Sequence, residues 1–361
     1  MRANQLELGW IPAASGHQVY EVSASRGIVS VKGSSGLAIC RGAYMYLRNA
    51  CSSMVTWSGQ RLALPEKFPD YERQRVVCPY QFVEYYNVCT FGYTTAFWNW
   101  RRWERELDWM ALHGVTMPLA MEGQEIIWDR VWNSMGMTRA ELDRFSTGPA
   151  HLPWHRMGNL NYFDGPLPEG WMDQKRLLQK KILGRMLELG MFPIVPAFAG
   201  HVPEAFKRVY PKAKTFTLIW SDEPRLSVTF LLDLGERDLY KQIGRDFIQE
   251  YKKEYGAGEY YLADSFNEMR VPVTAAHRYA DLAQYGRTIY EGILAGDPNG
   301  KWVMQGWLFF NDWKFWDPES IKAFLSQVPD DRMVIIDYAS DATWGAGSDR
   351  PSNPVWERSQ A

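Results

Sequence analysis

The sequence lacks several features that mark common classes of protein. Its 361 residues sum to a net charge of −2, which gives no electrostatic footprint for nucleic acid or an anionic membrane. No apolar run approaches the roughly 18 residues that a membrane span needs. There is no GxGxxG sequence and no P-loop, so nothing indicates a nucleotide site.

Metal ligands are also sparse. The four cysteines, Cys40, Cys51, Cys78 and Cys89, form no CxxC pair, so a zinc site is not expected and disulfides are permitted but not required. His201 has no second ligand four residues away, which favours a hydrogen-bonded role in organising its loop. We therefore expect neither a metal nor a cofactor.

The N-terminus has no basic region followed by an apolar stretch, so it does not match a secretory signal. The protein is then cytoplasmic, or its true start lies upstream. Neither the localisation nor the oligomeric state follows from the sequence.

Aromatic residues are the abundant class, with 17 Trp and 19 Tyr. Many of them are expected in the core, but aromatic rings also stack on the apolar faces of sugars. With 46% hydrophobic and 23% charged residues, the composition is otherwise that of an ordinary globular protein. A carbohydrate ligand is therefore the first hypothesis.

Residues 1–75 are predicted to form a small α/β domain. Segments 18–24 and 27–33 alternate apolar and polar residues, as half-buried strands do, and residues 37–50 have the apolar spacing of a helix. The Pro-rich segment 64–79 has no regular period and is expected to be a linker.

Residues 76–361 are predicted to form an incomplete (β/α)8 barrel of the TIM type, because short apolar strands alternate with helices. The expected helices are 100–114, 174–190 with Asp173 as N-cap, and 239–256 with Asp238 as N-cap. The expected strands are 84–91, 115–120, 192–200, 260–268, 301–309 and 332–340. Closure needs about eight strands, so the chain should stop before the barrel closes. A doubly wound sheet is the alternative.

The functional side chains of such a barrel lie at the carboxyl ends of its strands. The residues that follow the predicted strands are Asn87 and Cys89, then Glu122, Gln124 and Glu125, then His201, then Asp264, Asn267 and Glu268, then Trp307, and last Asp337. A mouth rich in acids, amides and Trp suits a polyhydroxylated ligand. It has no cluster of Lys and Arg, which argues against phosphate.

Glu268 is the leading catalytic candidate, since a carboxylic acid beside an amide at a strand end can protonate a glycosidic oxygen. The alternative is an ion pair with Arg270 or with another base at the barrel rim. Cys89 has no His partner on a neighbouring strand end, so a packing or pocket-lining thiol is preferred over a nucleophile. Glu125 begins a predicted helix, where an acid favours the helix dipole, so a structural role is expected.

Eight segments together resemble glycoside hydrolase family 89, the α-N-acetylglucosaminidases. They lie in order between about residue 20 and about residue 335, and they are YYNVCT, WNWRRWERELDWMALHGV, GQEIIWDRVW, TGPAHLPWHRMGNL, DGPLPEGWM, ELGMFPIVPAFAGHVPEAF, ADSFNEM and VMQGWLF. Long matches built around Trp, Gly and Pro make this resemblance specific.

The resemblance implies a small N-terminal α/β domain, a (β/α)8-type barrel and an all-helical C-terminal domain. It implies removal of terminal α-linked N-acetylglucosamine from glycans with retention of configuration, and a secreted, periplasmic or lysosomal location. It makes Glu268 the acid/base and Asn267 its sugar-binding neighbour. The other residues that it places around the sugar are Asn87, Cys89, Trp154 and Trp307.

Two departures from the family affect the expected activity. Glu122 stands where a small or uncharged residue is expected. The resemblance also places the nucleophilic glutamate, the last barrel strands and the helical domain beyond Ala361. Retaining hydrolysis needs two carboxylates roughly 5–5.5 Å apart, so we expect an inactive fragment. The alternatives are a non-catalytic glycan-binding protein that keeps the sugar pocket, and a barrel hydrolase with another sugar specificity.

Overall fold

The computed structural model describes residues 3–62, 64–220 and 228–338. The chain divides into two compact units. The first unit contains residues 1–86, 98–119 and 180–193, and the second contains residues 87–97, 120–179 and 194–361.

The main sheet of the first unit has the strand order β1-β3-β2-β6, in which β1 is parallel to β3 and the other pairs are antiparallel. Its strands are β1 (Leu6–Trp10), β2 (Val19–Ser25), β3 (Ile28–Gly33) and β6 (Tyr71–Val77). Helix α1 (Gly36–Ala50) begins at Ser35, whose hydroxyl accepts a hydrogen bond from the Ala38 N–H. Its apolar side packs with Val22, Val29 and Val31 of the sheet to form a core.

The prediction of a linker over residues 64–79 was wrong, because β6 lies within that segment and pairs with β2. β6 is an edge strand whose side chains are nearly all exposed, so its sequence has no alternation to detect. The other edge strand, β1, was also not predicted.

The first unit also contains the predicted helix α3 (Trp100–His113), which ends at Gly114, and the short parallel strands β7 (Glu84–Tyr85) and β8 (Met117–Pro118). The first predicted strand, 84–91, is shorter than expected because Tyr86 adopts a left-handed φ of +82°. A small hairpin pairs β4 (Met54–Val55) with β5 (Gln60–Arg61).

The second unit is built on four parallel strands in the order β15-β14-β13-β9, which confirms the predicted parallel arrangement. These strands are β9 (Ile194–Pro196), β13 (Tyr260–Leu262), β14 (Lys301–Gln305) and β15 (Met333–Ile336). The Ala120 N–H donates to the Ile194 carbonyl at 2.8 Å, which joins the chain after the second predicted strand to β9. The prediction that no strand follows residue 340 concerns residues outside the described part of the chain.

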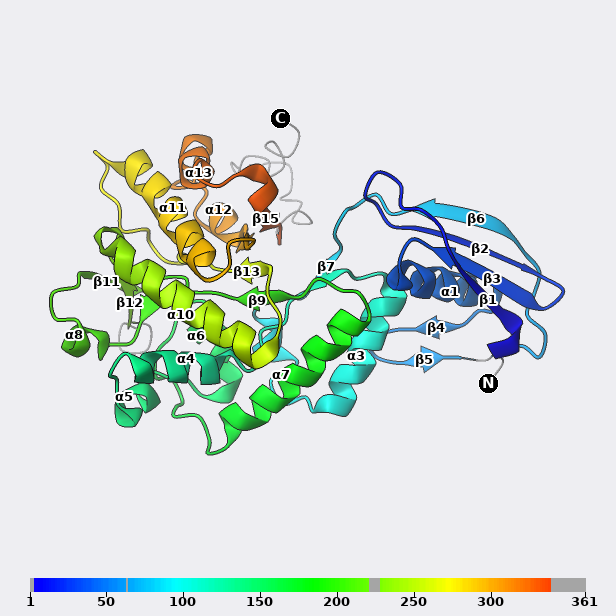
Figure 1. The fold of residues 1–361 in the computed structure, drawn as a ribbon, viewed down its shortest axis with the longest axis horizontal. Coiled ribbons are helices and arrows are strands. Elements are labelled where there is room, and N and C mark those ends of the chain that lie inside the picture. The colour runs from blue at the N-terminus through cyan, green and yellow to red at the C-terminus, as the bar shows by residue number, and fades with distance from the viewer. Residues whose placement is uncertain (1–2, 63, 221–227, 339–361) are drawn as a thin grey trace. The chain divides into compact units, whose positions relative to one another are not determined.

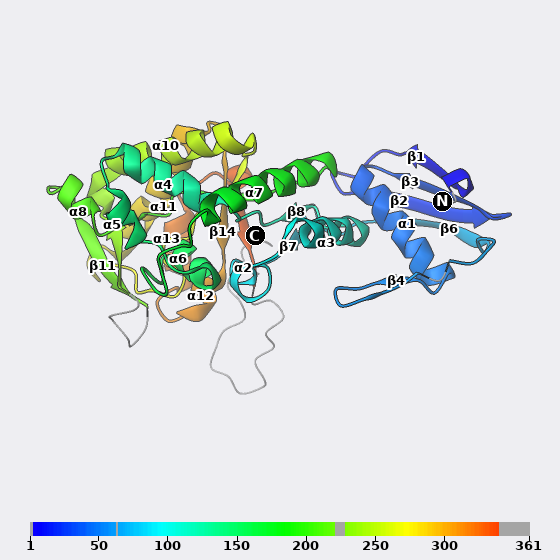
Figure 2. The same ribbon diagram turned by 90° about the horizontal axis from the view of Figure 1, so that it is seen from below.

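Four helices of the second unit pack as successive neighbours, in the order α4, α10, α11 and α13 (Figures 1 and 2). They are α4 (Gln124–Ser134), α10 (Arg237–Tyr255), α11 (Arg278–Gly296) and α13 (Pro318–Leu325). Helix α7 (Trp171–Glu188) has residues in both units. Asp173 and Asp238 were predicted to be the N-caps of α7 and α10. That prediction was wrong, because both lie in the first turns of these helices.

Shorter elements complete the second unit. The helices are α2 (Thr90–Tyr93), α5 (Arg139–Asp143), α6 (Leu152–Arg156), α8 (Phe206–Val209) and α12 (Trp307–Asn311). An antiparallel sheet, not predicted from the sequence, has the order β10-β12-β11 and consists of β10 (His201–Val202), β11 (Thr215–Ile219) and β12 (Val228–Leu232).

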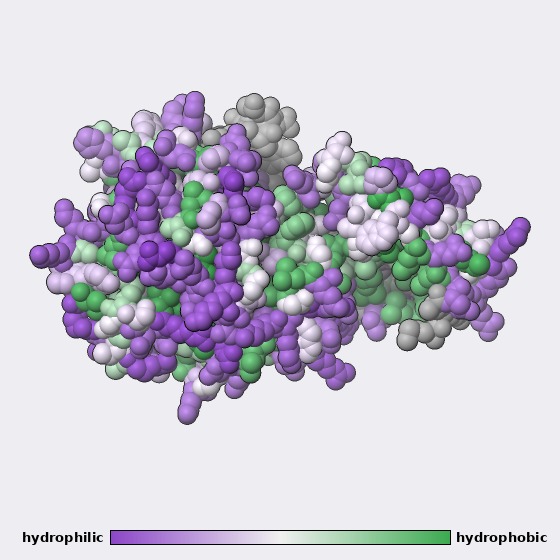
Figure 3. Space-filling model, in the orientation of Figure 1, coloured by the Kyte–Doolittle hydropathy of each residue, from purple (hydrophilic) through white to green (hydrophobic). Residues whose placement is uncertain are grey.

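Hydrophilic residues predominate on the face of the second unit that Figure 3 shows. Among the described helices, none combines the length and the apolar character that crossing a bilayer requires.

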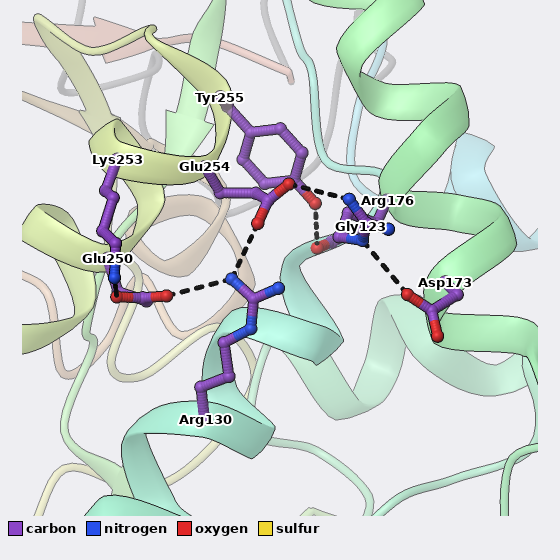
Figure 4. A network of polar contacts seen from close by, with 8 residues as sticks. All are labelled: Gly123, Arg130, Asp173, Arg176, Glu250, Lys253, Glu254 and Tyr255. Atoms are coloured by element: carbon purple, nitrogen blue, oxygen red, sulfur yellow. Dashed lines mark hydrogen bonds and ion pairs between the residues drawn. The ribbon is translucent and has the colours of Figure 1, made fainter.

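An ion-pair network ties three helices of the second unit together (Figure 4). Arg130 of α4 donates to Glu250 at 2.9 Å and to Glu254 at 2.7 Å, both on α10. Arg176 of α7 bridges Glu254 at 3.0 Å and Asp173 at 3.1 Å. Because several charges share partners, the network holds α4, α7 and α10 together more firmly than isolated surface pairs would.

Gly123, at the N-cap of α4, lies beside this network. Its φ is +66°, its carbonyl accepts a hydrogen bond from the Tyr255 hydroxyl at 2.7 Å, and a Cβ there would lie 2.6 Å from that hydroxyl and 2.9 Å from the Lys175 carbonyl. The position therefore requires glycine both for its backbone conformation and for space.

We expect Gly123→Ala to lower the free energy of unfolding more than Gly256→Ala does. Gly256 has the same φ of +66° but has open space around its Cβ position. Both variants should lose about 1–2 kcal/mol from the left-handed conformation. Gly123→Ala should lose at least about 1 kcal/mol more from overpacking. Urea unfolding followed by circular dichroism measures both, and equal losses would contradict the packing argument.

Candidate functional site

The Glu268 carboxylate lies just beyond β13 and is held by two indole N–H groups. Trp307 Nε1 donates to Oε1 at 2.8 Å, and Trp220 Nε1 donates to Oε2 at 2.7 Å. Glu268 and Trp307 therefore lie at the same edge of the parallel sheet. Arg270 is exposed, and no ion pair joins it to Glu268 within the described ranges, so the ion-pair alternative is not supported.

Asn267 is buried and is tied to the loop that follows α6. Its Nδ2 donates to Asn159 Oδ1 at 3.2 Å, and the Asn159 N–H donates to the Trp154 carbonyl at 2.7 Å. Trp154 lies on α6, in a loop region for which the strand pattern gave no position. The structure thus connects Trp154 to the residue that precedes Glu268.

Asn87 and Cys89 lie at the start of α2. The Asn87 Oδ1 accepts hydrogen bonds from the Thr90 N–H at 3.0 Å and from the Thr90 hydroxyl at 2.9 Å, which ties Asn87 to the first residue of this short helix. At the far end of α2, the Tyr93 ring lies edge-on to Trp154, with centroids 5.1 Å apart. α2 and α6 thereby bring these predicted site residues to one place.

Cys89 is a free cysteine close enough to Glu268 to sense its charge. Burial raises the pKa of the Cys89 thiol, and the negative charge of Glu268 raises it further. The thiol therefore stays protonated near neutral pH, which argues against a nucleophile and favours a group that lines the pocket.

Asp264 is a second carboxyl on the same segment as Glu268. Burial raises the pKa of Asp264 to about 7, although hydrogen bonds from the Phe266 and Asn267 N–H groups and from Gln305 oppose the rise. The charge of Glu268 adds to the rise, and Gln305 Nε2 donates to Asp264 Oδ2 at 3.2 Å. Near neutral pH this carboxyl is therefore partly protonated.

Two buried ion pairs lie among the other strand-end residues. Glu125 Oε1 pairs with Arg156 Nε at 2.7 Å, in agreement with the structural role expected for Glu125. Glu122, the departure from the family pattern, pairs with Lys175 at 3.0 Å, and Lys175 also donates to the Ala96 carbonyl. The unusual acid therefore has a compensating cation within the same chain.

His201 packs beneath the loop that holds Asn159. Its ring fills the space that a Cβ at Gly158 would need, and Gly158 has a φ of +74°. Burial lowers the pKa values of His201 and His155 to about 4, so both rings are neutral. His201 thus organises its loop by packing and not through the predicted hydrogen bond, since neither ring nitrogen has a hydrogen-bond partner among the described residues.

A cavity of about 60 Å³ adjoins the two histidines and the Glu125–Arg156 pair. None of the six predicted site residues lines this cavity, so it belongs to the packing behind the site. In the ranges that the structure describes, no group of three or more His, Cys, Asp or Glu side chains is arranged to hold a metal ion.

Two residues that contact the site were not predicted. Trp220 follows β11, and the alternation in TFTLIW, with Phe216, Leu218 and Trp220 on one side, was a usable strand signal. Asn159 lies in an irregular loop whose sequence has no period, so only the fold reveals its contact with Asn267.

Comparisons with known proteins agree with this geometry. The family model for the Alpha-N-acetylglucosaminidase (NAGLU) tim-barrel domain matches residues 84–360, and the model for its N-terminal domain matches residues 1–70. Human alpha-N-acetylglucosaminidase is 42% identical over 317 residues, which are 87% of this chain and 42% of the human protein.

Solved structures from Clostridium perfringens are also similar. The family 89 glycoside hydrolase in complex with 2-acetamido-1,2-dideoxynojirmycin matches with a TM-score of 0.84 and 27% identity, over 98% of this chain and 39% of that one. A variant with two glutamates replaced by glutamine, in complex with its substrate GlcNAc-alpha-1,4-galactose, matches with a TM-score of 0.82 and 28% identity, over 92% of this chain and 37% of that one.

The parallel strands with polar carboxyl ends, together with these matches, define a chain of the TIM-barrel class with an N-terminal α/β domain. The chain belongs to the α-N-acetylglucosaminidase family, glycoside hydrolase family 89. It spans about two fifths of the length of the relatives that it matches, 42% of the human protein and 39% of the bacterial one.

We expect Asp264→Asn to change the pH dependence of stability. The folded-state pKa of about 7 lies above the ordinary Asp value of 3.8, so the contribution of Asp264 to stability is fully present below about pH 4 and is lost as the pH rises through 7. Asn mimics the protonated acid and does not titrate. Between pH 4 and pH 8, the variant should gain up to about 4 kcal/mol relative to the original protein in urea unfolding.

Asp297→Asn provides a control of opposite sign. Burial acts to raise the pKa of Asp297, but hydrogen bonds from Lys252, Tyr261 and the Asn299 N–H outweigh it and lower the pKa below its ordinary value. That variant should lose stability relative to the original protein as the pH rises. A pH-independent effect of Asp264→Asn would show that its carboxyl titrates normally.

Proposed function

We propose that the protein removes terminal α-linked N-acetylglucosamine from glycans with retention of configuration, and that Glu268 is the general acid/base. The observation on which this rests is the Glu268 carboxylate, held at the strand ends between two indole N–H groups and next to the amide of Asn267. Similarity to the human and Clostridium perfringens enzymes supports the substrate class.

We further propose that the side chains around Glu268 bind the sugar. The amides of Asn267 and Asn87 can hydrogen-bond hydroxyl or acetamido groups, and the indole rings of Trp154 and Trp307 offer apolar faces for the sugar ring. Cys89 contributes a small, protonated thiol beside the acid. The same proposal assigns residues 1–75 to the small domain and residues 76–361 to the barrel.

Retaining hydrolysis needs a second carboxylate roughly 5–5.5 Å from the first. Three other acids at the strand ends are already engaged. Asp264 is buried and bonded to Gln305, while Glu122 and Glu125 are paired with Lys175 and Arg156. These contacts leave none of the three suited to attack the anomeric carbon, which supports a nucleophile from elsewhere.

Glu268→Gln in a full-length protein that contains this sequence should lower kcat/KM by about 10²–10⁴-fold on natural glycans. Glycosides with an activated aryl leaving group should lose much less, because their leaving oxygen needs no proton. Parallel kinetics on the two substrate types provide the measurement. Glu259→Gln, at a half-exposed acid that bonds Lys301, is the matched control and should leave both rates unchanged. Equal losses on both substrates would assign Glu268 a binding or structural role.

The 361 residues expressed by themselves should show no turnover of an aryl α-N-acetylglucosaminide above a buffer blank. Glu268 alone can supply a proton but cannot form a glycosyl-enzyme. Saturation-transfer NMR with free N-acetylglucosamine tests whether the pocket binds sugar without turnover, as the glycan-binding alternative requires. Turnover that disappears in the Glu268→Ala variant would show that a carboxylate within the 361 residues acts as nucleophile.

A further inference from the structure

We propose that Trp220 is a positioning residue for Glu268. Its indole N–H holds Oε2, orients the carboxyl group and favours its ionised form. This inference rests on the proposed function, because it concerns the group that acts as the general acid.

The two carboxylate oxygens have different partners. Oε2 accepts from Trp220 at 2.7 Å and Oε1 accepts from Trp307 at 2.8 Å, with one indole on each oxygen. An indole can donate but cannot accept. Both contacts therefore suit the ionised carboxylate. A carboxyl oxygen that bears a proton is a weaker acceptor for an indole N–H.

The element that contains Trp220 is anchored on both sides of Glu268. Trp220 directly follows the last β11–β12 pair, Ile219 with Val228. The Val228 carbonyl accepts from Asn161 Nδ2 at 3.2 Å, in the loop that also contains Asn159. On the other side, the Thr229 hydroxyl lies 3.9 Å from the sulfur of Met269, the residue after Glu268. The contacts of β11 and β12 with the neighbouring segments therefore hold Trp220 in place beside Glu268.

Trp307 differs from Trp220 because it is proposed to contact the sugar. The partner recorded for the Trp220 N–H among the described residues is the Glu268 carboxylate. In the first step Glu268 gives its proton to the glycosidic oxygen as that oxygen leaves the anomeric carbon and the nucleophilic carboxylate bonds to it, and Glu268 is left ionised. In the second step water attacks the anomeric carbon and displaces that carboxylate, while Glu268 takes a proton from the water and is restored as the acid.

Other titratable groups face Glu268 and must be separated from this effect. Asp264 lies on the same segment and has a pKa raised by burial to about 7, and Cys89 at the start of α2 has a thiol pKa that is also raised. Arg270 is exposed at the end of the segment. The comparison is therefore made both in the original protein and in an Asp264→Asn background.

The test replaces the indole N–H while keeping an aromatic ring. Trp220→Phe is the first variant, and the second has benzothienylalanine at position 220, which keeps the indole shape and lacks only the N–H. Trp57→Phe is the matched control, because Trp57 Nε1 donates to the Glu106 carboxylate at 2.6 Å in the first unit. In the 361-residue chain, the ¹³C signal of the Glu268 carboxyl is identified by its absence in Glu268→Gln and is titrated with pH.

Loss of a donor to an ionised carboxylate favours the protonated form, so the midpoint of the Glu268 titration should rise by about one pH unit in both position-220 variants. It should not move in Trp57→Phe. An unchanged midpoint in a folded benzothienylalanine variant, or an equal shift in the control, would overturn the proposal.

Kinetics in a full-length protein give a second readout. The alkaline limb of the kcat profile should move upward by a similar amount in Trp220→Phe, and the loss in kcat should be larger for poor leaving groups than for aryl glycosides. A uniform loss without a shifted profile would indicate a merely structural role. If Glu268→Gln itself leaves activity intact, the proposed function fails, while the NMR titration still decides whether Trp220 controls this carboxyl.

Discussion

The shared register of four parallel strands is the constraint on which the candidate site depends. Leu262 of β13 lies opposite Pro196 of β9 and Val303 of β14, so β9 and β13 end at one level and β14 ends two residues further on. Polar residues a few positions beyond each end then meet without any special local sequence. A slip of one residue would turn the side chains to the other face, so the core contacts of each strand also set the position of Glu268.

Buried charge lies directly behind this edge. Glu125 with Arg156, and Glu122 with Lys175, are almost fully removed from solvent. Such pairs gain little net free energy, because desolvation offsets much of the attraction, but a lone member of either pair would be very unfavourable. The two pairs therefore favour one arrangement of the segments that they join, and they add little to the free energy of unfolding. They link the start of α4 to α6 and to α7, and α6 holds Trp154.

Elements with a repeating pattern of apolar residues could be predicted from the sequence, whereas elements without such a pattern could not. Periodicity identified the four parallel strands and the helices α7 and α10 but missed α11 and α13, and the strand ends led to Glu268, Asn267 and Trp307. Resemblance alone supplied Trp154. β6 was missed because an exposed edge strand shows no buried alternation, and Asn159 because an irregular loop has no pattern. The alternation before Trp220 was a usable strand signal, but the pairing of β11 with β12 cannot be predicted from one segment alone.

Asp264 and Glu268 show how one segment can place two carboxyl groups in different environments. Asp264 is buried, and burial dominates over its hydrogen bonds, so its proton is retained until about pH 7. Glu268 is only half-buried, and its two oxygens accept hydrogen bonds from the indole N–H groups of Trp307 and Trp220. A proton on Asp264 removes a like charge from the neighbourhood of Glu268. The more exposed Glu268 is therefore the carboxyl to which the proposed chemistry assigns the exchanged proton, and Asp264 is a buried support that is partly protonated near neutral pH.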